Sequence, residues 1–117
     1  MPIVAFHGTA DRVNPYAGGN TPRWDESVRA AAEHWAAANG VPLQPTEEAV
    51  SATLTRSTYG TPGGAGEITL WTAARAGHTW PGTNLGMFLR LYLGRTNMEI
   101  DATKEIWDFI GRHAGDP

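Results

Sequence analysis

Ile3-Val4-Ala5-Phe6, followed by His7-Gly8, is a short and continuous apolar run. Such a run is typical of a strand that is covered on both faces, as in a parallel sheet with helices on either side. The polar loop that begins at Thr9 is of the kind found at the carboxyl end of a sheet strand, where open α/β sheets bind their ligands. The stretch therefore predicts an α/β fold with a candidate site beyond the first strand.

Periodic patterns further along the chain predict a helix and a hairpin. In residues 24–39 apolar side chains recur every three or four positions, which indicates an amphipathic helix that Gly40 closes. Alternation over residues 50–59 predicts a half-buried strand, and residues 67–73 predict the return arm of a hairpin. The expected sheet is thus mixed and has about three strands.

The last part of the chain predicts a second long helix. Asp101 is a good N-cap for it. We expect an apolar stripe along this helix, formed by Ile106, Trp107, Phe109, Ile110 and His113. Trp24, Trp35 and Trp107 fall at helical spacing with other apolar residues, which predicts that they lie in the core. The apolar residues 85–93 are compatible with a short helix and with an irregular covering segment.

Length, charge and composition limit the kinds of function that this chain can have. A chain of 117 residues predicts a single domain, residues 1–117. The net charge of −3 and the lack of a basic run argue against nucleic-acid or membrane partners. The chain has no cysteine, and its four histidines lack metal-ligand spacing, so we expect no metal and no cofactor. We expect neither a signal peptide nor a membrane span, and the sequence assigns no cellular location.

One histidine lies in a tight loop, Ala76-Gly77-His78-Thr79-Trp80-Pro81-Gly82, directly after the second hairpin strand. Histidine titrates near neutral pH, and the neighbouring glycines and proline fix where its ring points. By itself the loop is compatible with a catalytic base and with an ordinary exposed histidine. His7, His34 and His113 are interpreted as structural or surface residues.

Asp11 follows the first strand in the way that His78 follows the hairpin strand. If these strands are neighbours in one sheet, both loops emerge at the same edge. The Asp11 carboxylate would then accept a hydrogen bond from one imidazole nitrogen and leave the other nitrogen to act as a general base. The order of acid before histidine is that of the last two triad members in α/β-hydrolases.

Several motifs occur in order along the chain: Phe6-His7-Gly8-Thr9-Ala10-Asp11, then Val13-Asn14-Pro15-Tyr16-Ala17-Gly18-Gly19, then Gly77-His78-Thr79-Trp80-Pro81-Gly82, then Ile100-Asp101-Ala102-Thr103 with Ile106-Trp107-Asp108-Phe109. In these motifs, over residues 2–113, the chain resembles the C-terminal part of the polyhydroxybutyrate depolymerase and feruloyl esterase group of α/β-hydrolases. The resemblance implies a partial α/β-hydrolase fold with two long helices.

The same resemblance implies the roles of particular residues. Asp11 would be the catalytic acid and His78 the catalytic base. The substrate-binding candidates are Trp80 and Pro81, as a pocket wall beside the histidine, and Tyr16. The implied substrate is a carboxylic ester, either a small molecule such as an aryl ester or a hydroxyalkanoate oligomer or polymer.

The nucleophile of that group is not in this sequence. Members of the group carry a Gly-x-Ser-x-Gly elbow upstream, whereas this chain has only Ser27, Ser51 and Ser57, in the predicted first helix and first hairpin strand. We therefore expect that the N-terminal part with the nucleophile elbow is lacking. The nucleophile would come from a separate N-terminal hydrolase segment, from an activated water, or from a side chain placed by dimerisation.

The resemblance implies that, in a complete α/β-hydrolase, the strand at residues 3–6 would lie next to the strand that leads to the nucleophile. Without that neighbour it would have an unpaired edge and uncovered apolar surface, which predicts a dimer or larger homo-oligomer. Two functions stay open. The first is an esterase- or depolymerase-like segment that supplies Asp11 and His78 to a reaction. The alternative is a non-catalytic, self-associating domain derived from a truncated hydrolase.

Overall fold

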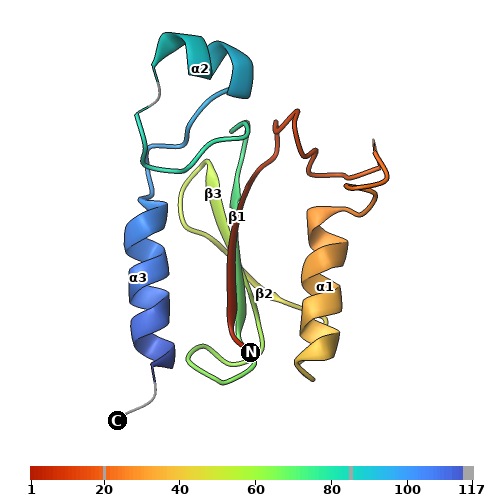
Figure 1. The fold of residues 1–117 in the computed structure, drawn as a ribbon. Helices are drawn as coiled ribbons and strands as arrows, with labels where there is room; N and C mark the ends of the chain where they lie inside the picture. The colour runs from red at the N-terminus through yellow and green to blue at the C-terminus, as the bar shows by residue number, and fades with distance from the viewer. Residues whose placement is uncertain (20, 85, 115–117) are drawn as a thin grey trace.

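A single mixed sheet with helices on both faces forms the fold (Figure 1). The computed structural model describes residues 1–19, 21–84 and 86–114. The strand order in the sheet is β1 (Ile3–Gly8), β4 (Ile68–Ala73), β3 (Leu54–Tyr59) and β2 (Thr46–Ala49). The expected α/β class and the mixed sheet are therefore confirmed.

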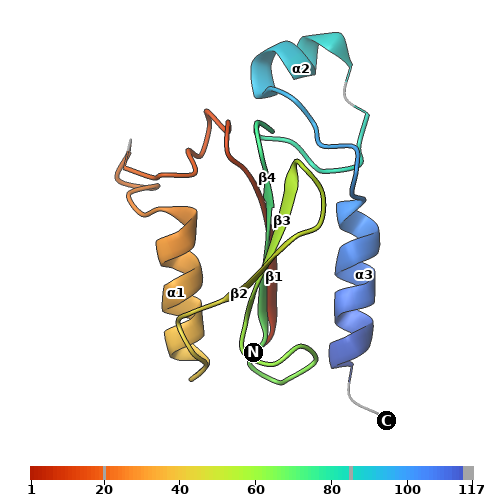
Figure 2. The ribbon, with the colours of Figure 1, turned by 180° about the vertical axis from the view of Figure 1, so that it is seen from behind.

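In the part of the chain that the structure describes there are three helices: α1 (Val28–Ala38), α2 (Met87–Leu93) and α3 (Ala102–His113). The views in Figures 1 and 2 place α1 on one face and α3 on the other, whereas α2 lies beyond the end of the sheet at which β1 and β4 finish. Among the described residues, no helix is long and apolar enough to cross a membrane.

The pairing of β1 with β4 is parallel and runs in register from Ile3 opposite Ile68 to Gly8 opposite Ala73. Alternate residues of β1 point to opposite faces. Ile3 and Ala5 pack against the core cluster under α1, and Val4 and Phe6 pack against the cluster on the other face. Each face of the first strand therefore contacts a core cluster, as its apolar run predicts, although Ile3 to His7 are only half-buried and the strand forms one end of the sheet.

The hairpin prediction is confirmed, because β3 and β4 pair antiparallel, but its first strand begins later than the alternation suggests. The strand starts at Leu54. Before it, the hydroxyl oxygen of Ser51 accepts hydrogen bonds from the backbone N–H groups of Thr53 and Leu54, at 3.2 and 3.1 Å. This local turn replaces the extended backbone that the pattern predicts.

The sheet has four strands, so the expectation of about three is not exact. The additional strand, β2, is Thr46-Glu47-Glu48-Ala49, and all four of its residues are exposed. It pairs antiparallel with β3 at the edge of the sheet. Because it has no buried face, it has no apolar alternation, which is the signal that reveals a strand in a sequence. The short α2 likewise adds to the two long helices that we expected.

The first helix begins later than its periodicity predicts. Ser27 is the N-cap of α1, and its side chain accepts a hydrogen bond from the Ala30 N–H at 3.0 Å. Trp24 therefore precedes the helix. Gly40, just beyond the C-cap, has a φ of +68°, a conformation that suits glycine and agrees with its predicted role in ending the helix.

The last helix has its predicted N-cap but a narrower buried face than predicted. The Asp101 side chain accepts from the Lys104 N–H at 3.1 Å. Ala102 and Phe109 are buried, whereas Trp107 is 75% exposed and Ile110 is also exposed, so the expectation that Trp107 lies in the core is wrong. Residues of an α-helix are about 100° apart, which puts Trp107 roughly 140° around the axis from Ala102, away from the sheet.

Candidate active site

The parallel pairing of β1 with β4 brings the loops that carry Asp11 and His78 together at one edge of the sheet. The Nδ1 nitrogen of His78 donates a hydrogen bond to the Oδ2 oxygen of Asp11 at 2.9 Å. The two residues are 67 positions apart in the sequence. The contact therefore depends on the sheet topology and on the path of both loops.

The Asp11 carboxylate is buried and held in one orientation. Asp11 is 6% exposed. Its Oδ1 oxygen accepts from the backbone N–H groups of Val13 and Asn14, at 2.9 and 2.8 Å, which forms a tight local turn. These bonds offset the cost of burying a charged group. Since Oδ1 holds the loop, Oδ2 remains free to orient the imidazole.

The His78 loop is fixed by the segment that follows α2. The N–H groups of Gly77 and His78 donate to the carbonyl oxygens of Arg95 and Leu93, both at 2.8 Å. The hydroxyl of Thr79 also donates to the Arg95 carbonyl, at 3.1 Å. The backbone on both sides of His78 is therefore hydrogen-bonded before any ligand arrives.

Two glycines allow the close backbone approaches of this region. A Cβ atom on Gly77 would lie 2.0 Å from the carbonyl oxygen of Leu93, and one on Gly8 would lie 2.2 Å from that of Ala76. No real Cβ atom is found so close to a carbonyl oxygen, so both positions require glycine. The contact between Gly8 and Ala76 joins the end of β1 directly to the His78 loop.

The His78 ring stands at a cavity of about 400 Å³. Its side chain is 43% exposed. Because Nδ1 carries the proton that it donates to Asp11, Nε2 presents its lone pair, and it has no hydrogen-bond partner among the described residues. A buried carboxylate behind the ring and open space in front of it are what a general base requires.

The other predicted site residues lie in different places. Trp80 lines the cavity, and its Nε1 donates to the Thr103 hydroxyl at 3.0 Å, which ties the indole to the first turn of α3. Pro81 is buried and lines a separate small void beneath the loop. Tyr16 does not line the cavity; its hydroxyl lies 3.2 Å from that of Thr72. The structure thus brings only Trp80 of the three to the same cavity as Asp11 and His78.

Sequence reasoning missed an aromatic wall of this cavity. Trp24 lines it, and its ring stacks on His7 with a centroid distance of 5.6 Å. The Nε2 of His7 donates to the Asn14 carbonyl at 2.7 Å and lies 3.4 Å from Asp11 Oδ2. Packing and hydrogen bonding agree with the interpretation of His7 as a structural residue. The helical spacing of Trp24 concealed its place here, because the pattern assigned it to α1.

None of the three serines is among the residues that line this cavity. Ser27 caps α1, and Ser57 is buried in β3. Ser51 hydrogen-bonds the turn before β3 and the carboxylate of Glu99. The cavity therefore holds an acid and a base but no serine nucleophile from the described part of the chain.

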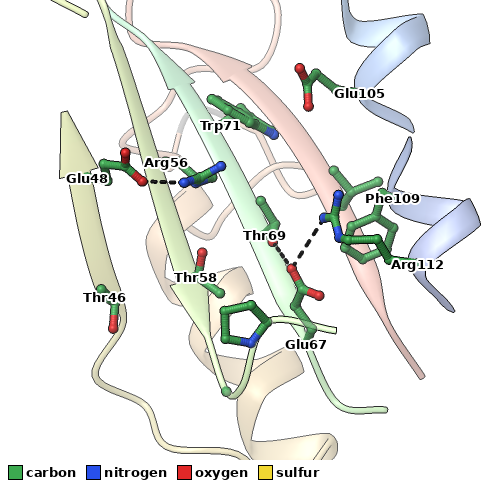
Figure 3. A pocket seen from close by; sticks show the side chains of 13 residues that line it. Thr46, Glu48, Arg56, Thr58, Glu67, Thr69, Trp71, Glu105, Phe109 and Arg112 are labelled. Carbon is green, nitrogen blue, oxygen red and sulfur yellow. Dashed lines mark hydrogen bonds and ion pairs between the residues drawn. The ribbon is translucent and has the colours of Figure 1, made fainter. Parts of the chain in front are cut away.

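A second cavity, of about 350 Å³, lies between α3 and the face of the sheet that α3 covers (Figure 3). Four of the five charged side chains that line it form two ion pairs, and the fifth, Glu105, has no ion-pair partner among the described residues. Arg56 pairs with Glu48 and lies 5.5 Å from the Trp71 ring centroid, and Arg112 lies 3.7 Å from Glu67. This internal pairing makes the cavity a structural junction.

Glu67 is the buried centre of that junction. It is 2% exposed and accepts from the Thr69 hydroxyl, the Gly63 N–H and His113 Nε2, at 2.7, 2.8 and 2.7 Å. Burial alone raises the pKa of Glu67, but these hydrogen bonds, with a smaller contribution from Arg112, outweigh burial and hold the pKa below its ordinary value. The ionised carboxylate thereby joins the end of α3 to the loop before β4.

Within residues 1–19, 21–84 and 86–114, no group of three or more histidine, aspartate or glutamate side chains is arranged to hold a metal ion. Comparison of the chain with protein-family models, with curated protein sequences and with solved structures finds no match.

Proposed function

We propose that the chain is a segment of a carboxylic ester hydrolase, in a partial α/β-hydrolase fold, that supplies the catalytic acid Asp11 and the catalytic base His78. The observation that carries the proposal is the 2.9 Å hydrogen bond between His78 Nδ1 and a buried, backbone-anchored Asp11 carboxylate, beside an open cavity. The order of the motifs along the sequence supports the same class of enzyme.

In this mechanism Asp11 holds the neutral imidazole with its proton on Nδ1. His78 Nε2 removes the proton of the nucleophile as it attacks the ester carbonyl, and Asp11 stabilises the imidazolium that forms. Nε2 then returns the proton to the leaving alcohol. The rings of Trp24 and Trp80, with Phe6, line the cavity and favour an ester with an aryl or other apolar group.

The nucleophile is supplied from outside the described cavity. Among the three sources that the sequence leaves open, a separate hydrolase segment is favoured by the position of β1. A strand that paired in parallel with the free side of β1 would end at the same end of the sheet as β1 and β4, where Asp11 and His78 meet. Activated water is a weaker candidate, because removing the serine of a triad lowers turnover by about a million-fold.

A non-catalytic, self-associating domain is the second candidate. It is favoured by the absence of serine from the cavity lining and by the apolar side chains on the surface of α2. Met87, Phe88 and Tyr92 are all exposed, and α2 has no buried residue. Such a surface is more typical of an interface than of a monomer.

Hydrolysis of p-nitrophenyl acetate and p-nitrophenyl butyrate by the purified chain separates the two candidates. Where the chain, alone or with an added N-terminal hydrolase segment, turns the ester over, we expect Asp11→Asn and His78→Ala each to lower the rate by about a hundredfold or more. His34→Ala is the matched control, because His34 is an exposed imidazole that pairs with Glu26, and free imidazoles hydrolyse such esters slowly. Hydrolysis that survives both site substitutions contradicts the enzymatic proposal.

Labelling with a fluorophosphonate probe tests the nucleophile separately. Labelling of the chain would identify a reactive serine. Turnover that depends on His78 without labelling would favour activated water. If the chain alone is inactive, restoration of His78-dependent turnover by an added N-terminal hydrolase segment would support a divided site.

A further inference from the structure

A third cavity, of about 360 Å³, lies beside α2. Its lining comes from the loop after His78, from α2 and from the segment after α2, and consists of Thr83, Asn84, Arg90, Arg95, Thr96 and Met98. None of these residues is acidic. The lining therefore combines two guanidinium groups with two hydroxyl groups and one amide.

Arg90 and Arg95 are both exposed, and neither has a carboxylate partner among the described residues. Within the described residues, Arg29, Arg56, Arg112 and Lys104 each form an ion pair. The other five arginines form none in that part of the chain, and of these five Arg90 and Arg95 line this cavity together. Glu99, which follows the same segment, is hydrogen-bonded by the hydroxyls of Ser51 and Thr53. Glu99 lines a neighbouring void and not this cavity, so no carboxylate lies in the lining beside the two guanidiniums.

Guanidinium groups present planar pairs of N–H donors that match the two oxygens of a carboxylate or of a phosphate. Threonine hydroxyls and the asparagine amide can donate further hydrogen bonds to the same kind of oxygen. A neutral or cationic ligand would leave both guanidiniums without a partner. The chemistry of the lining thus selects an oxyanion.

The cavity adjoins the segment that positions His78. The carbonyl of Arg95 accepts from Gly77 N–H and from the Thr79 hydroxyl, and the carbonyl of Leu93 accepts from His78 N–H. Leu93 lines the His78 cavity, and Arg95 lines the cavity beside α2, which we call the arginine cavity. A ligand held by Arg95 would therefore contact the segment to which the His78 loop is hydrogen-bonded.

We propose that this arginine cavity binds the oxyanion group, a carboxylate or a phosphate, of a small molecule. The inference does not depend on ester hydrolysis by Asp11 and His78. It rests on the two unpaired guanidiniums, the neutral donors beside them and the volume that the three segments enclose.

Titration of the ¹⁵N-labelled chain with sodium succinate, and separately with sodium phosphate, tests the proposal at constant ionic strength. We expect saturable shifts of the backbone signals of Thr83, Arg95 and Thr96, accompanied by those of Gly77 and His78. The uncharged succinamide should cause none of them. The Arg90→Gln, Arg95→Gln double variant should bind about tenfold more weakly or not at all.

Arg23→Gln is the matched control, because Arg23 is exposed and does not line this cavity, and it should bind as the unmodified chain does. The Arg90→Lys, Arg95→Lys variant keeps the charge but loses the planar donor pairs, so its affinity should be intermediate; it also replaces the glutamine variant if that variant does not fold. Tighter binding of succinate identifies the ligand class as carboxylate, and tighter binding of phosphate identifies it as phosphate. Failure of both probes to saturate, or an equal loss in Arg23→Gln, overturns the proposal.

Discussion

Two of the carboxylate–imidazole pairs in this chain, each with a buried carboxylate, have similar lengths but different surroundings. His78 lies 2.9 Å from Asp11 and His113 lies 2.7 Å from Glu67. The His113 side chain is 8% exposed, and its Nε2 is the nitrogen bonded to Glu67, whereas the half-exposed His78 keeps Nε2 free beside a cavity. Distance alone does not identify a catalytic base, since an accessible second nitrogen is also needed.

At the same scale, we predict that Glu67→Gln destabilises the fold in a pH-dependent way. The pKa of Glu67 is lowered in the folded chain, so its ionised form stabilises folding above the unfolded pKa of about 4.3, and this contribution is lost as the pH falls below that value. We expect the free energy of unfolding to decrease by about 2 kcal/mol at pH 7. Urea unfolding at pH 7 and at pH 3.5 measures the difference between the two chains.

The difference should be smaller at pH 3.5, because the carboxyl of the unfolded chain is largely protonated there and the ionised form of the folded chain stabilises it less. Glu105→Gln is the control, because Glu105 lines the same cavity and has no ion-pair partner among the described residues. A Glu67→Gln effect that is the same at both pH values would contradict the proposed role of the ionised form.

We also predict that Gly77→Ala disturbs the His78 loop. The new Cβ would lie 2.0 Å from the Leu93 carbonyl, so the loop or the segment after α2 has to move. We expect a loss of about 1–3 kcal/mol in the free energy of unfolding and shifted backbone signals for His78 and Leu93. Gly86→Ala is the matched control, because a Cβ there meets nothing within 4 Å. Unchanged His78 signals in Gly77→Ala would show that the close approach does not position the loop.

At the scale of elements, local sequence signals succeeded where an element has a buried face or a specific cap. The first strand, the second hairpin strand and both long helices were predicted from apolar periodicity and from Asp101. The edge strand β2 was not, because its exposed residues carry no periodic signal. The helical pattern puts Trp107 in the core, but this side chain is exposed because α3 contacts the sheet through a narrower face than its apolar stripe suggests.

The N-cap of α3 gives a prediction at this scale. Asp101→Ala removes the acceptor for the Lys104 N–H, and we expect the free energy of unfolding to fall by about 1 kcal/mol. Chemical denaturation measures the change, and Asp25→Ala, at an exposed residue outside any helix, serves as the control. Equal stability of Asp101→Ala and the unmodified chain would mean that packing of Ala102 and Phe109 alone holds the start of this helix.

For the whole molecule, the main feature is that the outermost strand of the sheet, β1, has the continuous apolar sequence that is typical of a central strand. Because β1 contacts a core cluster on each face yet pairs on one side only, we predict that the chain associates through this edge, with itself or with a strand of a hydrolase segment. Light scattering at micromolar concentration should give a dimer or a larger species. Amide hydrogen exchange in β1 should slow as the protein concentration rises.

A monodisperse monomer with rapid exchange in β1 would remove the basis for self-association. Protection confined to α2 would instead assign the interface to the exposed apolar side chains of that helix. Phe88→Glu is the useful comparison, because Phe88 is fully on the surface and its substitution should leave the fold unchanged.

The sequence by itself determined the α/β class, the first strand, the hairpin, the Asp101 cap, the end of the first helix at Gly40, and the presence of an acid and a histidine after two strands. These features depend on local backbone preference and on which side chains avoid water. Only the tertiary structure decided that β1 pairs in parallel with β4, that Asp11 therefore contacts His78, and that Trp24 joins their cavity. The reason is physical: pairing between segments more than 60 residues apart depends on how the whole core packs, which no local pattern records.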